Sequence, residues 1–124
     1  TRKESSAASD VYKRQQYEES FPKLQQSNID IISLECHNSH VPIDLLELVR
    51  GKKVMVGAID VASDKVETPE EVANTLRKAL QFVDADKLYP CTNCGMAPLS
   101  RAIAKGKLLA LSEGAEIVRK ELLG

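Results

Sequence analysis

Long apolar runs, a surplus of charge of one sign and an even set of cysteines are all missing from this chain of 124 residues. No apolar run approaches the ~20 residues of a membrane-spanning helix, and no basic start followed by an apolar run marks a signal peptide. The 17 Lys and Arg residues balance 18 Asp and Glu residues, so the formal net charge of -1 gives no reason to expect nucleic acid or an anionic membrane as partner. We therefore expect a soluble protein that acts on a small molecule.

The cysteines are few and odd in number. Of the three, two form Cys91-x-x-Cys94, so a secreted disulfide framework is not expected and a reducing cytoplasm is the expected compartment. One interpretation of the pair is a thioredoxin-type redox motif, although such a motif opens a helix after the first strand and this one follows the last. Another is a structural zinc ribbon, for which Cys36 with His37 and His40 is the candidate second half.

The first part of the chain differs from the rest. Residues 1–16 are polar and lack a sustained apolar period, which predicts a disordered arm. Within it, residues 5–15 resemble the in-frame translation of a common transposase-type sequencing-library adapter. Residues 1–16 are therefore interpreted as an artefactual arm, and residues 17–124 as the domain.

Strand-like runs alternate with helical patterns along residues 17–124. The runs are Ile29–Glu35, Val54–Ile59 and Leu88–Cys91, and the second is almost continuously apolar, as in a parallel strand covered on both faces. Their spacing fits βα units, which average about 31 residues each in an eight-unit barrel. Strand-helix alternation predicts a parallel sheet of the α/β class. Because three units cannot close a barrel, the chain is expected to be part of a larger α/β domain.

The helices are predicted from their ends and their apolar faces. A short helix over Tyr17–Gln26, broken or started near Pro22, precedes the first strand. The helix after the second strand has Thr68 as N-cap, Pro69 in its first turn and Glu71 placed for a capping box. The expected inward faces are Phe21 and Leu24; Leu45, Leu46 and Val49 between Pro42 and Gly51; Val72, Leu76, Ala79, Leu80 and Val83; and Leu108, Leu111, Ala115, Val118 and Leu122.

Reactive side chains follow the carboxyl ends of the strands, where α/β folds build active sites. Glu35 ends the first run, and a desolvated carboxylate there needs a cation or a donor, unless it serves as an N-cap or surface ion pair. Cys94 lies beside Gly95 in a strand-to-helix loop that allows a tight turn. A thiolate and a carboxylate suit Zn²⁺, which takes about four ligands from Cys, His and Asp or Glu. His37 and His40 are candidates for substrate contact or for solvated loop positions.

Three motifs carry a resemblance to a known family. In order they are Asp30-Ile-Ile-Ser-Leu-Glu35, the run from Val54 to Ser63, and Leu88-Tyr-Pro-Cys-Thr-Asn-Cys-Gly95. From about Tyr17 onward the chain resembles the end of the catalytic barrel of cobalamin-independent methionine synthase. The resemblance implies the C-terminal three βα units of a (β/α)8 TIM barrel, as a fragment.

The resemblance also implies a metal site. That family holds zinc by a His-x-Cys pair on an earlier strand, by a Glu that ends a strand, and by a Cys in an Asn-Pro-Asp-Cys-Gly-like loop. Carried over, the implied metal ligands are Glu35 and Cys94, with Cys91 as a neighbour. The His-x-Cys pair has no counterpart here. Truncation would explain this, because the motif is expected upstream of the first strand.

A second departure concerns the substrate. Where the long enzyme has an Asp-Ile-His-Ser stretch, this chain has Ala62 in place of the histidine. Asp60, Ser63 and His37 then remain as the implied substrate-binding residues. With this departure and with the second cysteine of the loop, Cys91, the chain resembles shorter members of the family. The methyl donor of these members need not be the polyglutamylated folate.

The implied activity is zinc-dependent methyl transfer to the thiol of homocysteine, which gives methionine (5-methyltetrahydropteroyltriglutamate-homocysteine S-methyltransferase-like). The partners are homocysteine and a methyl donor, a methyl-folate or another carrier, with no nucleic acid and no membrane. With half of the ligands missing, the chain alone is expected to be inactive and to bind zinc weakly. Two alternatives stay open: another zinc thiol alkyltransferase or decarboxylase-type barrel of the same superfamily, and a Cys-x-x-Cys zinc or redox module.

Overall fold

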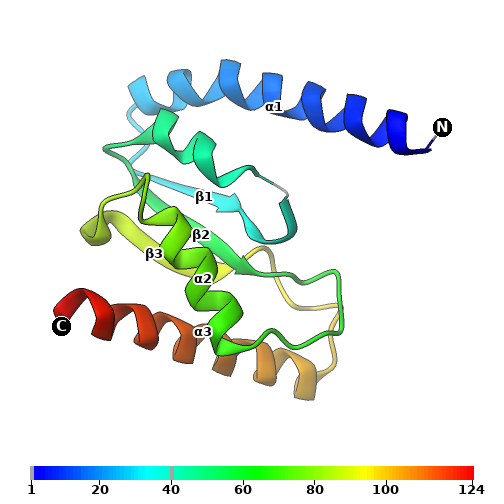
Figure 1. Ribbon diagram of the computed structural model, residues 1–124, viewed down its shortest axis with the longest axis vertical. Coiled ribbons are helices and arrows are strands. Elements are labelled where there is room, and N and C mark those ends of the chain that lie inside the picture. Colours follow the sequence, from blue (N-terminus) through cyan, green and yellow to red (C-terminus); the bar gives the residue numbers. More distant parts are fainter. Residues whose placement is uncertain (1, 40) are drawn as a thin grey trace.

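The computed structural model describes residues 2–39 and 41–124, and arranges them as one sheet with helices packed against it (Figure 1). The elements in chain order are α1 (Arg2–Gln26), β1 (Ile31–Glu35), η1 (His37–Ser39), η2 (Ile43–Val49), β2 (Lys53–Ile59), α2 (Pro69–Ala79), η3 (Ala85–Lys87), β3 (Leu88–Thr92) and α3 (Arg101–Leu123), where η marks a 3-10 helix.

The sheet is parallel throughout. Its three strands lie in the order β1-β2-β3, and β2 pairs with both neighbours in parallel. Each crossover carries helical turns, η2 between β1 and β2, and α2 between β2 and β3. This arrangement confirms the α/β class and the succession of βα units that the sequence predicts.

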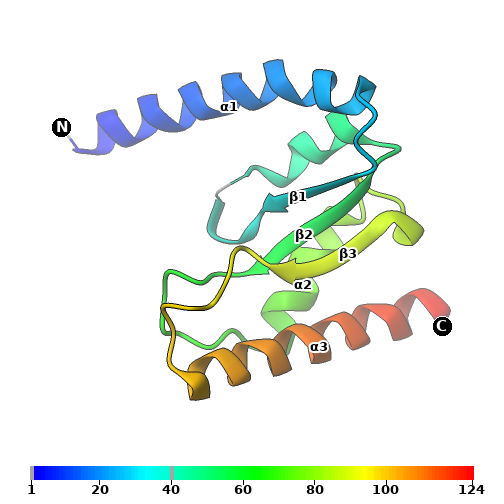
Figure 2. The same cartoon turned by 180° about the vertical axis from the view of Figure 1, so that it is seen from behind.

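Helices cover one face of the sheet and leave the other open (Figure 2). Alternation along the strands sends Ile32, Val54 and Val56 to the helix side, where they are buried. On the other side Met55 is 37% and Tyr89 is 43% exposed. The sequence predicted that β2 is covered on both faces. This is right for the face that carries the helices and wrong for the other, on which no described element packs.

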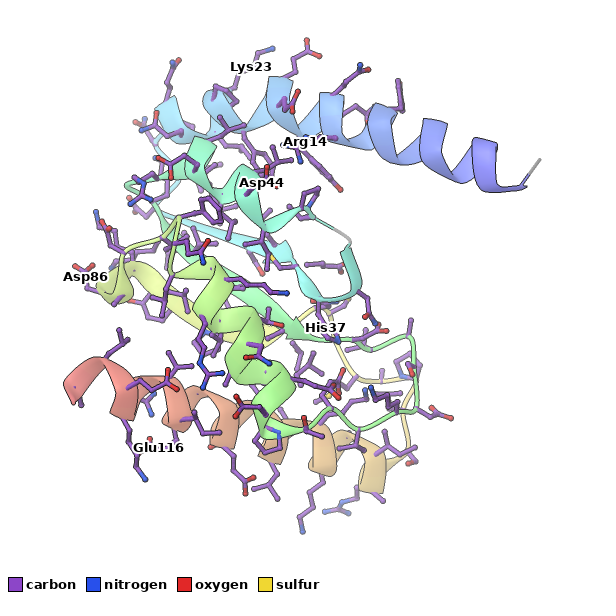
Figure 3. All side chains as sticks on the ribbon, in the orientation of Figure 1. Arg14, Lys23, His37, Asp44, Asp86 and Glu116 are labelled. Atoms are coloured by element: carbon purple, nitrogen blue, oxygen red, sulfur yellow. The ribbon has the colours of Figure 1, made fainter. Side chains whose placement is uncertain are left out.

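The N-terminal helix is longer than the sequence predicts. Residues 1–16 were expected to be disordered, yet α1 begins at Arg2 and passes through Pro22 without interruption. Residues 2–16 contain neither Gly nor Pro and are rich in good helix formers, so nothing stops the helix. Arg14 donates to both carboxylate oxygens of Asp44, at 3.2 and 2.6 Å, and this contact holds the pKa of Asp44 below its usual range (Figure 3). The artefactual origin of this segment stays a prediction.

The segment between β1 and β2 carries the expected apolar side chains on a 3-10 helix, which is wound more tightly than an α-helix. Residues 43–49 form a 3-10 helix, which ends before Gly51 at φ 99°, a left-handed conformation that favours glycine. The predicted inward side chains Phe21, Leu45, Leu46 and Val49 are buried, and Leu24 packs against them. α1 is thereby fixed to the rest of the domain.

The last two helices pack on each other and on the sheet. Thr68 caps α2, because its Oγ1 accepts a hydrogen bond from Glu71 N at 3.1 Å, as predicted. The predicted stripe on α3 is right at Val118 and wrong at its ends, where Leu108 is 49% and Leu122 is 56% exposed. The side chain that turns inward beside Leu108 is Lys107. None of the described helices has the length and apolar content to cross a membrane.

The contact between α2 and α3 depends on a glycine, which gives a first prediction. A Cβ at Gly114 would lie 2.5 Å from Val72 Cβ and 2.8 Å from Pro69 O. We expect Gly114→Ala to lower the free energy of unfolding by about 1–3 kcal/mol, because the helices must separate. The matched control is Gly106→Ala, which meets only the methyl groups of Val66 at 3.3 Å and improves helix propensity. Urea unfolding compares the variants; equal stability of the two would contradict the close approach.

Candidate active site

The carboxyl ends of the strands bring the predicted residues to one edge of the sheet. The register pairs Glu35 with Gly57, and Gly57 with Cys91. Side chains at paired positions of parallel strands point to the same face, so Glu35 and Cys91 lie on one face, two strands or roughly 10 Å apart. That face is the one without helices. Between them lies β2, whose residue at the paired position, Gly57, has no side chain.

Asn93 lies over this gap and joins the strand ends. A Cβ on Gly57 would collide with Asn93 Oδ1 and come within 2.9 Å of Leu34 O. Asn93 N donates to Ile59 O at 2.8 Å, and its Nδ2 donates to His37 O at 3.3 Å. Its Oδ1 is buried and has no hydrogen-bond partner among the described residues. Asn93 was not predicted as a functional residue, and the single signal for it in the sequence is its place between two cysteines.

The cysteines differ in exposure. Cys94 is exposed in the loop after β3, where Thr92 Oγ1 donates to Cys94 O at 2.9 Å. Cys91 is half-buried, and burial raises the pKa of its thiol, partly offset by a hydrogen bond with Ser33. Cys36 is buried, which raises the pKa of its thiol to about 12. Metals bind the thiolate, so the buried thiol of Cys36 is a poor candidate for the second half of a zinc ribbon. His40, named with it, lies outside the described residues.

These environments predict an order of thiol reactivity. We expect iodoacetamide near neutral pH to alkylate Cys94 first and Cys36 last, because Cys36 is enclosed and burial raises the pKa of its thiol to about 12, so that little thiolate forms. Peptide mass spectrometry over time measures the order, and unfolding in urea is the control that should equalise the rates. Early labelling of Cys36 in the folded chain would contradict the burial.

Asp60 follows β2 directly and is held at several points. Its side chain is oriented by two donors, Ala62 N to Oδ1 at 2.9 Å and Asn38 Nδ2 to Oδ2 at 2.7 Å. Asn38 has φ 58° and ψ 34°, a left-handed conformation that Asn adopts more readily than most residues. Asp60 is 8% exposed. Asn38 was not predicted as a functional residue.

A buried ion pair lies behind Asp60. Lys107 Nζ is 3.0 Å from Glu67 Oε1, with the side chains of Lys107 and Glu67 exposed by 0% and 3%. Glu67 Oε2 accepts a hydrogen bond from Asp60 N at 2.9 Å and lies 3.8 Å from His37 Nε2. Neither residue of the pair was predicted, because charged side chains are normally assigned to the surface.

The three predicted substrate-binding residues are thus placed differently. Asp60 and His37 meet the same carboxylate, Glu67, and Figure 3 shows His37 where η1 approaches the chain that follows β2. His37 also borders an open groove of about 520 Å³ between η1 and α2. Ser63 Oγ accepts from Lys65 N at 3.1 Å, a contact that shapes the turn. All three roles stay predictions.

The described residues do not make a complete metal site. Among the side chains that the structure describes (residues 12, 14–38 and 41–124), no three from His, Cys, Asp or Glu converge to hold a metal. Glu35 ends β1 and Cys94 lies in the loop after β3, and these two side chains are fewer than the four ligands that zinc usually takes.

The chain matches the model of a known protein family. A family model described as the catalytic domain of cobalamin-independent synthase matches residues 12–116. The chain belongs to this family. The resemblance drawn from the three strand-end motifs is thereby confirmed.

Individual relatives agree. The chain is 39% identical over 108 residues to the 2-hydroxypropyl-CoM lyase of Xanthobacter autotrophicus, covering 82% of this chain and 29% of that protein. It is 38% identical over 104 residues to the methionine synthase of Saccharolobus solfataricus, covering 82% and 31%.

A solved structure matches as well. The B12-independent methionine synthase from Shewanella sp. W3-18-1, in complex with selenomethionine, is 82% identical with a TM-score of 0.85, covering 87% of this chain and 32% of that one. This match confirms that the βα units form part of the synthase barrel. The chain spans about a third of the length of these relatives.

Proposed function

We propose that the protein to which this chain belongs transfers a methyl group to the thiol of homocysteine and so produces methionine. The observation that carries the proposal is the 82% identity to the Shewanella methionine synthase at a TM-score of 0.85. Because the chain spans about a third of that protein, the activity is proposed for the chain completed by the rest of the barrel.

Glu35 and Cys94 are proposed to hold zinc. Glu35 ends β1 and Cys94 lies just after β3, the two strands on either side of β2, and a carboxylate with a thiolate is a donor set that Zn²⁺ accepts. The remaining ligands then come from outside this chain. When bound, zinc lowers the pKa of the homocysteine thiol, so that a thiolate forms near neutral pH.

The transfer makes one bond and breaks one. The homocysteine sulfur forms a bond to the methyl carbon, while the bond between this carbon and the donor breaks and its electron pair stays with the donor, which takes up a proton. Asp60 is proposed to contact the substrate, because it follows β2 directly at the carboxyl edge of the sheet, where α/β folds bind ligands. His37 and Ser63 are proposed as further substrate contacts. Ala62 offers no group for proton transfer at its position.

A second candidate is chemistry on a different thiol compound. The 39% identity to a 2-hydroxypropyl-CoM lyase favours it, because that relative is named for a compound of CoM. The two candidates share the fold and differ in the substrate, so an assay on defined substrates separates them. The methyl donor, a methyl-folate or another carrier, is part of the same assay.

The test uses a chimera in which residues 17–124 replace the matching third of the Shewanella synthase. We expect the chimera to form methionine from homocysteine and methyl-tetrahydrofolate, measured by mass spectrometry, and to hold about one zinc per chain. The unaltered Shewanella protein is the control. A folded chimera that forms no methionine with any of several methyl donors would contradict the proposal. Turnover of 2-hydroxypropyl-CoM in its place would favour the second candidate.

A further inference from the structure

The buried ion pair of Lys107 and Glu67 holds one stretch of main chain at the carboxyl edge of the sheet. Lys107 projects from α3. Its Nζ donates to the carbonyls of Asp60 and Lys65, at 2.9 and 2.6 Å, and to Glu67 Oε1 at 3.0 Å. Glu67 Oε2 accepts from Asp60 N at 2.9 Å. The pair therefore fixes Asp60 both at its N–H and at its carbonyl.

Asp60 connects this pair to the turn after β1, residues 36–39. Its Oδ2 accepts a hydrogen bond from Asn38 Nδ2 at 2.7 Å. Asn38 is the single non-glycine residue with a positive φ in the part of the chain that the structure describes. The neighbouring His37 is held as well, because its carbonyl accepts from Asn93 Nδ2 at 3.3 Å and its Nε2 lies 3.8 Å from Glu67 Oε2. The turn is thus fixed by side chains from the segments that follow β2 and β3.

The turn starts at Glu35, the last residue of β1. Glu35 O accepts from Val41 N at 2.8 Å, and Cys36 N donates to Gly57 O at 3.1 Å. The main chain of Glu35 therefore belongs both to the strand and to the base of the turn. A side chain that binds a metal must lie within about 0.5 Å of its productive position, so the turn helps to decide where the Glu35 carboxylate lies.

Stability alone is a weak reason for the buried pair. Burying two charges requires their desolvation, and replacing a buried ion pair by apolar residues of similar volume is often neutral or stabilising. The contacts of Lys107 and Glu67 instead reach a single edge of the sheet, and they link it to a helix more than forty positions further along the chain. This geometry suits the positioning of a residue at that edge.

We propose that Lys107 and Glu67 are positioning residues for the metal ligand Glu35. They act through Asp60 and Asn38, which fix the turn that starts at Glu35. The inference rests on the proposed function, in which Glu35 holds zinc, and it does not depend on the substrate contact proposed for Asp60. Loss of the pair is expected to lower the affinity for the metal, because the Glu35 carboxylate is then less well placed.

The test measures the zinc affinity of the chimera by competition with a chelator. Asn38→Gly keeps a residue that accepts positive φ but removes the amide that donates to Asp60. Glu67→Gln and Lys107→Met break the buried pair at either end. We expect each substitution to lower zinc affinity about tenfold or more, as is usual when a contact that supports a metal ligand is removed. Lys105→Met, at an exposed position of α3, is the matched control.

A destabilised variant separates positioning from a general loss of stability. Gly114→Ala is expected to loosen the contact between α2 and α3, and the atoms that its Cβ meets belong to Val72 and Pro69, outside the turn. We expect it to unfold at lower urea concentration and to change zinc affinity by less than about twofold. A zinc affinity that falls as far in Gly114→Ala as in Asn38→Gly would overturn the inference.

A second background shows whether the effect passes through Glu35. In a chimera with Glu35→Ala the carboxylate is absent, so the position of the turn should no longer affect the metal. We expect Asn38→Gly to lower zinc affinity by less than about twofold in this background, against about tenfold when Glu35 is present. Equal losses in the two backgrounds would overturn the inference.

Failure of the inference differs from failure of the proposed function. A chimera that binds zinc but forms no methionine contradicts the proposed function, while the zinc affinities still decide the positioning role. A chimera that binds no zinc overturns the ligand role of Glu35 and this inference with it. If Lys107→Met does not fold, Asn38→Gly at its exposed position makes the same comparison. Zinc affinities of Asn38→Gly and Glu67→Gln equal to that of Lys105→Met contradict the positioning role alone.

Discussion

Cys94→Ser in the chimera is expected to remove most of the bound zinc and to lower homocysteine methylation at least about 100-fold, because an alcohol replaces a thiolate ligand. Cys91→Ser is the matched control, three positions earlier in the same segment. It is expected to keep zinc and to lose less than about tenfold in rate. Zinc is measured by mass spectrometry of the metal, and methylation by the appearance of methionine.

The contrast between the two variants is decisive because the structure separates the two thiols. Cys94 is exposed in the loop, whereas Cys91 is half-buried in β3 and lies level with Glu35 in the register. Equal loss of zinc from both would indicate that the cysteines act together, as in a zinc or redox module. Loss from Cys91→Ser alone would assign the ligand to Cys91. Either result would contradict the ligand role proposed for Cys94.

The parts of the fold that the sequence predicts are those with local signals. Thr68, Pro69 and Glu71 mark the start of α2, and the structure places the cap there. The three apolar runs form parallel strands, as their spacing predicts. The segments between them are long enough for the helical crossovers that parallel strands require. Glu35 and Cys94 could be predicted because one ends a strand and the other follows one, and parallel strands bring their carboxyl ends to one edge.

The parts that the sequence does not predict depend on contacts between distant residues. Leu108 and Lys107 are adjacent, and a charged side chain is normally placed outside, so the apolar period assigned the core position to Leu108. The three acceptors that bury Lys107 come from the segment after β2 and cannot be inferred from α3 itself. The same holds for Asn93, which follows β3. Its side-chain amide occupies the space that Gly57 of β2 leaves open by having no Cβ.

Gly57 also leads to the second large prediction. We expect Gly57→Ala to lower the free energy of unfolding by about 1–3 kcal/mol or more, because the new methyl group collides with Asn93 Oδ1 and lies 2.9 Å from the main-chain oxygen of Leu34. Part of this contact is with backbone, which cannot rotate away. The ends of the strands must then move apart, so zinc affinity of the chimera is expected to fall about 10- to 100-fold.

A double substitution separates the two effects. Asn93→Ala removes the amide that the methyl group meets, so Gly57→Ala combined with Asn93→Ala should recover part of the lost stability, as expected for residues in contact. Zinc affinity should not recover, because the bond from Asn93 Nδ2 to His37 O is lost with the amide. Urea unfolding and competition for zinc with a chelator measure the two quantities, with Gly106→Ala as control. A Gly57→Ala chimera with unchanged stability and zinc affinity would show that Asn93 does not hold the strand ends together.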